Sequence, residues 1–258
     1  MAVKIISVAK QLPKYSRETK EIIPFVKLWM QDQDKRFQRK VIKLFEGAGV
    51  DKRFSIMSPE EVFTATSFEE KNNIYTNEVV RLAEKSLKKS LLKAGLKPTD
   101  LDYIITVSCT GIMIPSLDAY LINSFKMKQD IVRLPVTEMG CAAGVSGIIY
   151  AKNFLKANPN KRAIVVAVEA PSATFQLEDY SMTNIVSAAI FGDGASSVIL
   201  SSYEEDNGPK IIDQAMYHFY DATHMMGFKL VNTGLQMILD KEVPKKISEH
   251  FPAIIHPF

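Results

Sequence analysis

The sequence predicts an α/β layered fold with a largely parallel central sheet. Two observations predict it: short continuous apolar runs rich in β-branched residues, and segments of helical spacing that alternate with them. Strands buried on both faces have such runs, and their alternation with helices is typical of parallel sheets. At 258 residues the chain can bury a large core. The predicted strands are residues 3–10, 101–109, 130–136, 162–170, 195–202 and 210–221.

Helices are predicted where apolar residues recur at helical spacing. This spacing is regular over residues 74–94, and Gly95 supplies a stop at the C-terminal end. A helical segment over residues 20–49 is interrupted at Pro24, and Pro252 is expected to kink or break the last helix. The predicted helices are residues 20–49, 74–94, 115–125, 141–157, 179–191 and most of 227–258.

A turn signal at residues 207–209, Asn-Gly-Pro, divides the chain into two parts. Residues 1–208 form the first part, which is complete in its alternation of strands and helices. In residues 209–258 the pattern restarts with a strand and a helical stretch and then stops. We therefore expect a complete first half followed by a truncated second half.

Composition excludes several classes of function. The net charge is +3 with lysines and acids interspersed, so no basic patch predicts nucleic-acid binding. No segment reaches the roughly 18 consecutive apolar residues of a membrane span, and the N-terminal apolar run is too short for a signal peptide. Two cysteines make no disulfide framework, which favours a reducing cytoplasm. The four histidines lack metal-ligand spacing, so no metal site is expected.

Cys141 stands where a strand gives way to a predicted helix, after Gly140 and before a run of small residues. The N-terminus of a helix carries a partial positive charge, which favours a thiolate over a thiol. Small neighbours let a bulky thioester approach the sulfur. The alternative is a small core residue at a close helix contact, since free cysteine is often buried. The stretch by itself leaves the two readings evenly balanced.

Four stretches that follow one another along the chain resemble the type III polyketide synthases, the chalcone-synthase-like branch of the thiolase-fold condensing enzymes. The resemblance extends from residues 50–56 to residues 238–244. It implies a thiolase-like layered fold, a homodimer, and coenzyme A thioesters as substrates with no further cofactor. It also makes Cys141 the nucleophile that carries the acyl group. The four stretches are "CTGIMIPSLDAYL", "RLPVTEMGCAAG", "VEAPSATF" and "AIFGDGASSVIL".

The same resemblance assigns three further residues around the cavity. Phe191 matches a gatekeeping phenylalanine that also assists malonyl decarboxylation; the alternative is a plain core aromatic. Cys109 matches a residue of the cavity wall, although a small buried residue at the end of a strand is nearly as good an interpretation. Ile114 matches a residue that reaches across the dimer into the partner's cavity.

The resemblance also bears on the two ends of an acyl-coenzyme A substrate. Met237 stands where plant members carry a second gating phenylalanine, and a flexible thioether there widens the pocket. We therefore hypothesise an aliphatic starter acyl group rather than an aromatic one. The residues that match acyl-pocket positions are Pro171, Ala173, Thr174 and Met237. The residues that match a segment facing coenzyme A phosphates are Lys43, Lys52 and Arg53, although lysines at a surface are usually only solvated.

Two catalytic groups of the family have no match in the sequence: the histidine of an "HPGG"-type stretch and a later asparagine, which form an oxyanion hole. His256-Pro257 lacks the glycines and is interpreted as part of a helix. We therefore expect the chain, taken alone, to be severely impaired. Two rival functions stay open, namely a ketoacyl-(acyl carrier protein) synthase III-like enzyme and a non-catalytic remnant or interaction module.

Overall fold

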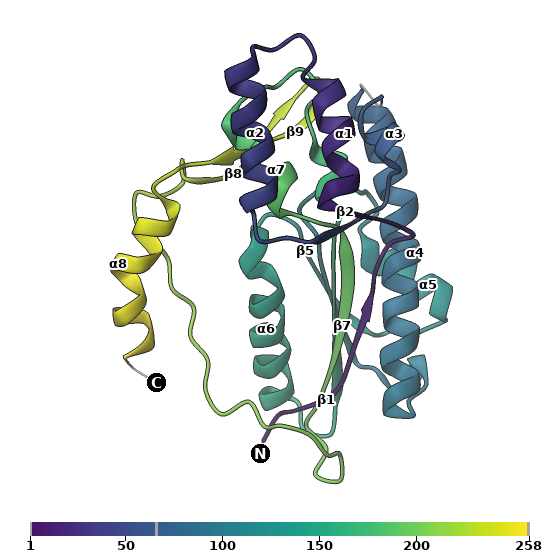
Figure 1. The fold of residues 1–258 in the computed structure, drawn as a ribbon. Coiled ribbons are helices and arrows are strands. Elements are labelled where there is room, and N and C mark those ends of the chain that lie inside the picture. The colour runs from purple at the N-terminus through teal and green to yellow at the C-terminus, as the bar shows by residue number, and fades with distance from the viewer. Residues whose placement is uncertain (1, 65–66, 257–258) are drawn as a thin grey trace. The chain divides into compact units, whose positions relative to one another are not determined.

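The computed structural model describes residues 2–64 and 67–256 (Figure 1). Its internal contacts divide the chain into two compact units, which are described separately. The two units interleave along the chain, so they differ from the contiguous parts 1–208 and 209–258, and that division stays a prediction. Unit 1 contains the chain up to Leu12, Thr76–Glu169 and Gly194–Met216; unit 2 contains Pro13–Tyr75, Ala170–Asp193 and the chain from Tyr217 onward.

Unit 1 is built on a five-stranded sheet with the strand order β1-β7-β6-β4-β5. β4 pairs in parallel with both β5 and β6, whereas β7 is antiparallel to β6 and to β1. All strands except β7 therefore run in one direction, which confirms the largely parallel sheet. The strands are β1 (Lys4–Gln11), β4 (Tyr103–Val107), β5 (Val132–Val136), β6 (Arg162–Glu169) and β7 (Gly194–Ser201).

Helices cover both faces of this sheet (Figure 1). On one face lies α6 (Ala143–Ala157), where a Cβ on Gly147 would come within 2.9 Å of the Val165 side chain. On the other lie α4 (Phe68–Ala94) and α5 (Leu117–Phe125), and the Ser86 hydroxyl of α4 bonds the Ser197 hydroxyl at 2.9 Å. All five residues of β4 are buried, as expected for a strand covered on both faces. The short 3₁₀ helices of this unit are η1 (Pro98–Asp100) and η2 (Gly140–Ala142).

Unit 2 contains short helices, two two-stranded antiparallel sheets and a small apolar core. The core brings together α1, α2 and α7 through Val26, Met30, Val41, Phe45 and Ile185. The helices are α1 (Thr19–Trp29), α2 (Lys35–Gly47), α3 (Pro59–Val62), η3 (Pro171–Thr174), α7 (Met182–Ile190) and α8 (Val243–Ile255). The first two-stranded sheet pairs β2 (Tyr15–Glu18) with β3 (Lys52–Ser55), which are separated along the chain by α1 and α2. The second is a hairpin of β8 (Met226–Val231) and β9 (Gly234–Leu239).

The predicted interruption at Pro24 is wrong. Pro24 lies inside α1, and the break comes between α1 and α2, where the Asp34 side chain accepts the N–H groups of Arg36 and Phe37. A side-chain cap satisfies the unpaired N–H groups of a new helix and so determines where it begins. Pro252 likewise lies inside α8 without ending it.

Two predictions for the end of the chain are also wrong. The expected strand over residues 210–221 is reduced to one isolated bridge between Lys210 and Lys4. The expected helical stretch from residue 227 begins instead with the β8–β9 hairpin, and only α8 is helical. The hairpin turns at Asn232-Thr233, and Gly234, the first residue of β9, has φ +126°, a conformation that side chains disfavour.

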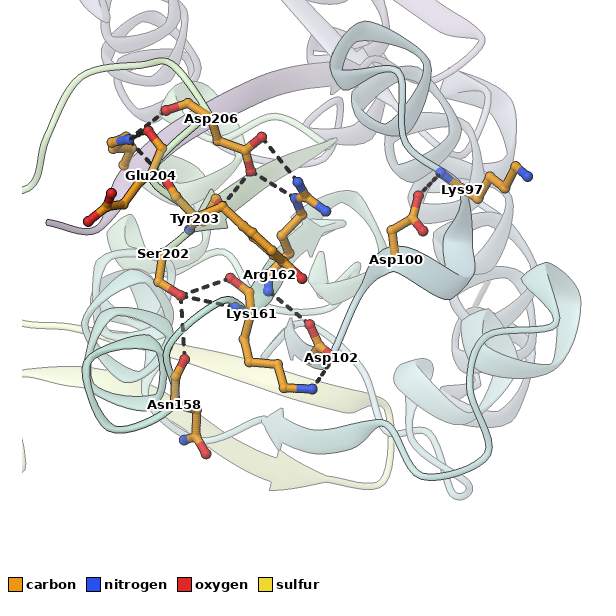
Figure 2. Close-up of polar contacts among 12 residues, drawn as sticks. Lys97, Asp100, Asp102, Asn158, Lys161, Arg162, Ser202, Tyr203, Glu204 and Asp206 are labelled. Atoms are coloured by element: carbon orange, nitrogen blue, oxygen red, sulfur yellow. Dashed lines mark hydrogen bonds and ion pairs between the residues drawn. The ribbon is translucent and has the colours of Figure 1, made fainter. Parts of the chain in front are cut away.

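A polar network closes the end of the sheet where β4 and β6 begin (Figure 2). The Asp102 carboxylate accepts Lys128 Nζ at 2.8 Å, Lys161 Nζ at 2.9 Å and the backbone N–H of Arg162 at 3.0 Å. The Arg162 guanidinium in turn makes a two-pronged contact with Asp206 at 2.8 and 3.1 Å. Burial by itself would raise the pKa of Asp102, but these hydrogen bonds outweigh it and hold that pKa below the ordinary 3.8.

We expect Asp102→Asn to lower the free energy of unfolding at pH 7 by about 2 kcal/mol, because it removes the charge that two lysines face. Since the folded pKa is depressed, the contribution is present above pH 3.8 and is lost as the pH falls below it. Urea unfolding between pH 7 and pH 3 measures both effects. Asp130→Asn, at an exposed site, is the matched control. Equal losses for the two variants at pH 7 would contradict the assignment.

Candidate active site

Cys141 lies on a short turn between β5 and α6. Gly140 has φ +58°, a left-handed conformation that favours glycine, and the 3₁₀ turn Gly140–Ala142 follows. α6 begins at Ala143, two residues later than predicted, and no side chain caps its N-terminus. The exposed Cys141 thiol therefore directly precedes the uncapped N–H groups of a 15-residue helix.

Parallel pairing brings three chemistry-bearing residues to one edge of the sheet. Cys109 follows β4, Cys141 follows β5, and Glu169 is the last residue of β6. The carboxyl ends of parallel strands meet at one edge, which is where ligands bind in open α/β sheets. The backbone N–H of Cys109 donates to both Glu169 carboxylate oxygens, at 3.0 and 3.1 Å, and the Thr110 hydroxyl donates at 2.7 Å.

The two thiols at this edge differ in their exposure to solvent. Burial, followed by the negative charges of Glu169 and Cys141, raises the pKa of Cys109 to about 12. Burial also raises the pKa of Glu169, although the hydrogen bonds from Thr110 and Cys109 oppose it. Cys109 is therefore a neutral thiol near neutral pH, and it is only half-buried in the wall of this edge, while Cys141 is exposed.

Glu169 was not among the predicted site residues. Its sequence signal is an acidic residue at the end of a strand that is otherwise almost wholly apolar, "RAIVVAVE". Such a residue is more often exposed at the start of a loop. Only the pairing of β6 beside β4 shows that the carboxylate turns toward Cys109.

Unit 2 contains an apolar cavity of about 130 Å³. Phe191, Pro171, Thr174 and Met237, all predicted as site residues, line it, while the buried Ala173 is not among the described residues that do. Most of its remaining wall is aromatic or aliphatic. Those residues include Ile22, Val26, Trp29, Phe45, Phe54, Met57, Val62, Phe63, Phe175, Ile185 and Ala188.

The other predicted residues differ in exposure. Ile114 in unit 1 is 91% exposed and precedes Pro115 through a cis peptide bond. Lys43 and Lys52 in unit 2 are exposed. Arg53 is only 8% exposed and donates to protein acceptors, so its burial favours a structural role, and its assignment to coenzyme A stays a prediction.

His256 follows the last residue of α8, and its N–H bonds the Pro252 carbonyl at 3.0 Å. This agrees with its interpretation as part of a helix. Within residues 2–64 and 67–256, no three His, Cys, Asp or Glu side chains gather as metal ligands would. None of the helices in the described part of the chain combines the length and apolarity that crossing a membrane requires.

We expect iodoacetamide at pH 8 to modify Cys141 at least tenfold faster than Cys109, because Cys109 is half-buried and its thiol stays protonated. Glu169→Gln should speed the reaction of Cys109, since loss of the carboxylate charge lowers the pKa of that thiol. Mass spectrometry of the two cysteine peptides gives both rates. Glu138→Gln, which removes an exposed carboxylate, should leave the rate at Cys109 unchanged. Equal rates for the two cysteines in the unaltered protein would refute the assignment.

Comparisons with known proteins show which family and fold the chain shares. The chain is 28% identical over 212 residues to the phloroglucinol synthase of Pseudomonas fluorescens, covering 82% of this chain and 61% of that one. It is 30% identical over 213 residues to the 1,3,6,8-tetrahydroxynaphthalene synthase of Streptomyces coelicolor, covering 83% and 57%. The chain therefore spans about three fifths of the length of these curated relatives.

The fold is also similar to that of a solved type III polyketide synthase. The crystal structure of the Streptomyces coelicolor synthase, a bacterial type III polyketide synthase, matches with a TM-score of 0.91 and 27% identity over 97% of this chain and 71% of that one. This confirms the predicted thiolase-like layered fold. The sequence model described as FAE1/Type III polyketide synthase-like protein matches residues 9–220, well over half of the chain. The chain belongs to the FAE1/type III polyketide synthase-like family.

Proposed function

We propose that the protein is an acyltransferase of the type III polyketide synthase kind. The observation that carries the proposal is the exposed Cys141 thiol before the uncapped N-terminus of α6, in a chain of this family. The thiolate attacks the carbonyl carbon of an acyl-coenzyme A, a new C–S bond forms, and the bond to the coenzyme A sulfur breaks. The coenzyme A thiolate leaves and takes up a proton, and the acyl group stays on Cys141.

Extension uses malonyl-coenzyme A. The bond between its carboxylate and the neighbouring carbon breaks, carbon dioxide leaves, and the electron pair forms an enolate. The enolate carbon attacks the acyl carbonyl on Cys141, and the cysteine thiolate leaves, so the product is a β-ketoacyl-coenzyme A. Rounds of this Claisen condensation followed by cyclisation need only the two coenzyme A thioesters and no further cofactor.

The remaining residues have supporting roles in this proposal. Cys109 and the hydrogen-bonded Glu169 form the wall beside the nucleophile, and Phe191 gates and assists decarboxylation. Lys43 and Lys52 are exposed cations suited to coenzyme A phosphates. The proposal includes a homodimer, supported by the apolar side chain of Ile114, which is 91% exposed, and a cytoplasmic location.

Cys141→Ala should abolish acyl transfer. After incubation of the purified protein with octanoyl-coenzyme A, the mass of the Cys141 peptide should rise by one octanoyl group, and the variant should show no such increase. Carbon dioxide release from labelled malonyl-coenzyme A should be slow, because no match to the family histidine and asparagine is found, and it should be absent from the variant. If the unaltered protein neither loads acyl groups nor releases carbon dioxide, a non-catalytic interaction module is the better reading. If only malonyl-(acyl carrier protein) supports extension, the ketoacyl synthase III-like reading holds.

We further propose an aliphatic starter acyl group, bound in the apolar cavity of unit 2. Met237 lies on β9 and lines that cavity, and a phenylalanine there would fill space with a rigid ring.

We expect Met237→Phe to lower kcat/KM for octanoyl-coenzyme A at least tenfold relative to acetyl-coenzyme A, because the longer chain needs the space that the ring takes. Met226→Phe, at an exposed position on the paired strand β8, is the control and should leave the ratio unchanged. A preference of the unaltered protein for an aromatic starter such as 4-coumaroyl-coenzyme A would contradict the aliphatic assignment.

A further inference from the structure

The loop that carries Phe191 is held at both ends by side chains and backbone groups of unit 2. Phe191 follows α7 in an extended conformation, and its N–H bonds the Ser187 carbonyl at 3.0 Å. We propose that Arg53 and Asp193 are positioning residues, which hold Phe191 in its place on the cavity wall. This inference rests on the proposed function, in which Phe191 gates the cavity and assists decarboxylation.

Arg53 holds the residue two positions before Phe191. It lies on β3 and is 8% exposed. Its Nε donates to the Ala189 carbonyl at 2.9 Å, its Nη2 donates to the same oxygen, and its Nη1 donates to the Thr19 hydroxyl at 2.6 Å. The guanidinium carbon also lies 5.4 Å from the centre of the Phe45 ring. A buried guanidinium bound in this way cannot swing out to a phosphate without leaving the Ala189 carbonyl unpaired.

Asp193 is itself the residue two positions after Phe191, and its contacts hold the loop at this end. Its own N–H donates to the Phe54 carbonyl at 2.8 Å. Its carboxylate accepts the N–H of Ile56 at 2.7 Å and the N–H of Ser172 at 2.9 Å, and the Ser172 hydroxyl donates to it as well. The carboxylate is 4% exposed, so these bonds form in a dehydrated setting where they are strong.

Residues 53–56 therefore hold the Phe191 loop on both sides of Phe191. Arg53, Phe54 and Ile56 are near neighbours on and just after β3, and between them they bind both sides of Phe191. Through Ser172, Asp193 also ties down η3, whose Pro171 and Thr174 line the same cavity as Phe191. The Asp193 carboxylate links the Phe191 loop to η3. Without this carboxylate, we expect the loop to shift relative to η3.

The step that such positioning serves is decarboxylation. In the proposed function, acyl loading uses the Cys141 thiolate, whereas decarboxylation is assisted by the Phe191 ring and so depends on the position of that ring. Loosening the Phe191 loop should therefore slow carbon dioxide release more than it slows loading. Both rates would fall together if Arg53 or Asp193 merely stabilised the fold.

Amide hydrogen exchange tests the positioning without any need for activity. Arg53→Met should speed exchange of the Phe191 and Asp193 amides at least tenfold, and Arg53→Lys, which keeps one donor for Ala189, should have a smaller effect. Asp193→Asn should speed exchange at Ile56 and Ser172, because an amide can accept only one of their two N–H groups. Amides inside α2 and inside β4 are the references for unit 2 and for global unfolding. Lys27→Met, which removes an exposed cation of α1, is the matched control.

Kinetics supply the second readout. For Arg53→Met we expect carbon dioxide release from malonyl-coenzyme A to fall at least tenfold more than octanoyl loading on Cys141 falls, with partial recovery in Arg53→Lys. Unchanged exchange at residues 191 and 193 in both variants would overturn the positioning role. Faster exchange with equal losses of loading and decarboxylation would show a purely structural role. If the unaltered protein lacks both activities, the proposed function fails, and the exchange experiment still decides whether the two residues hold the loop.

Discussion

The parallel pairing of β4 with β5 and β6 is the constraint on which the site depends. Val107 of β4 is in register with Val136 on one side and Ala167 on the other, so the three strands end together. Each strand then delivers one functional group to the same edge: a thiol after β4, a thiol after β5 and a carboxylate at the end of β6. α6, packed tightly on β4 and β6 through Gly147, starts at this edge with an N-terminus that no side chain caps.

Cys109 and Cys141 lie at the same edge of the sheet but differ in burial. Beside the Glu169 carboxylate, Cys109 is a neutral thiol, and its backbone N–H is committed to that carboxylate. Cys141 stands on an exposed turn. A thiolate is the nucleophilic form of cysteine, so burial of the Cys109 thiol and exposure of Cys141 support the proposed acyl-carrying role of Cys141. The polar network around Asp102 stabilises the opposite ends of the same strands, away from the chemistry (Figure 2).

In unit 2, two buried charged side chains hold a loop that lines an apolar cavity. The cavity wall is mostly aliphatic and aromatic, and the Phe191 loop that forms part of it is held by the Arg53 guanidinium and the Asp193 carboxylate. Hydrophobic packing is not directional, and it tolerates small shifts of a ring such as that of Phe191. Hydrogen bonds with charged partners define distances and angles, and so they can hold one ring in one place.

The sequence by itself determined the parts of this protein that depend on local pattern. Continuous apolar runs identified the strands of the central sheet, and four ordered motifs around and after Cys109 predicted Cys141 as the nucleophile. Only the tertiary structure decided the β8–β9 hairpin, the Glu169 contact with Cys109 and the inward turn of Arg53. The spacing of apolar residues from residue 227 onward did not distinguish the β8–β9 hairpin from a helix. In such a short segment, either structure would bury only some of the apolar side chains. Glu169 and Arg53 look like surface charges in any linear reading, because their burial depends on distant segments that supply hydrogen-bond partners.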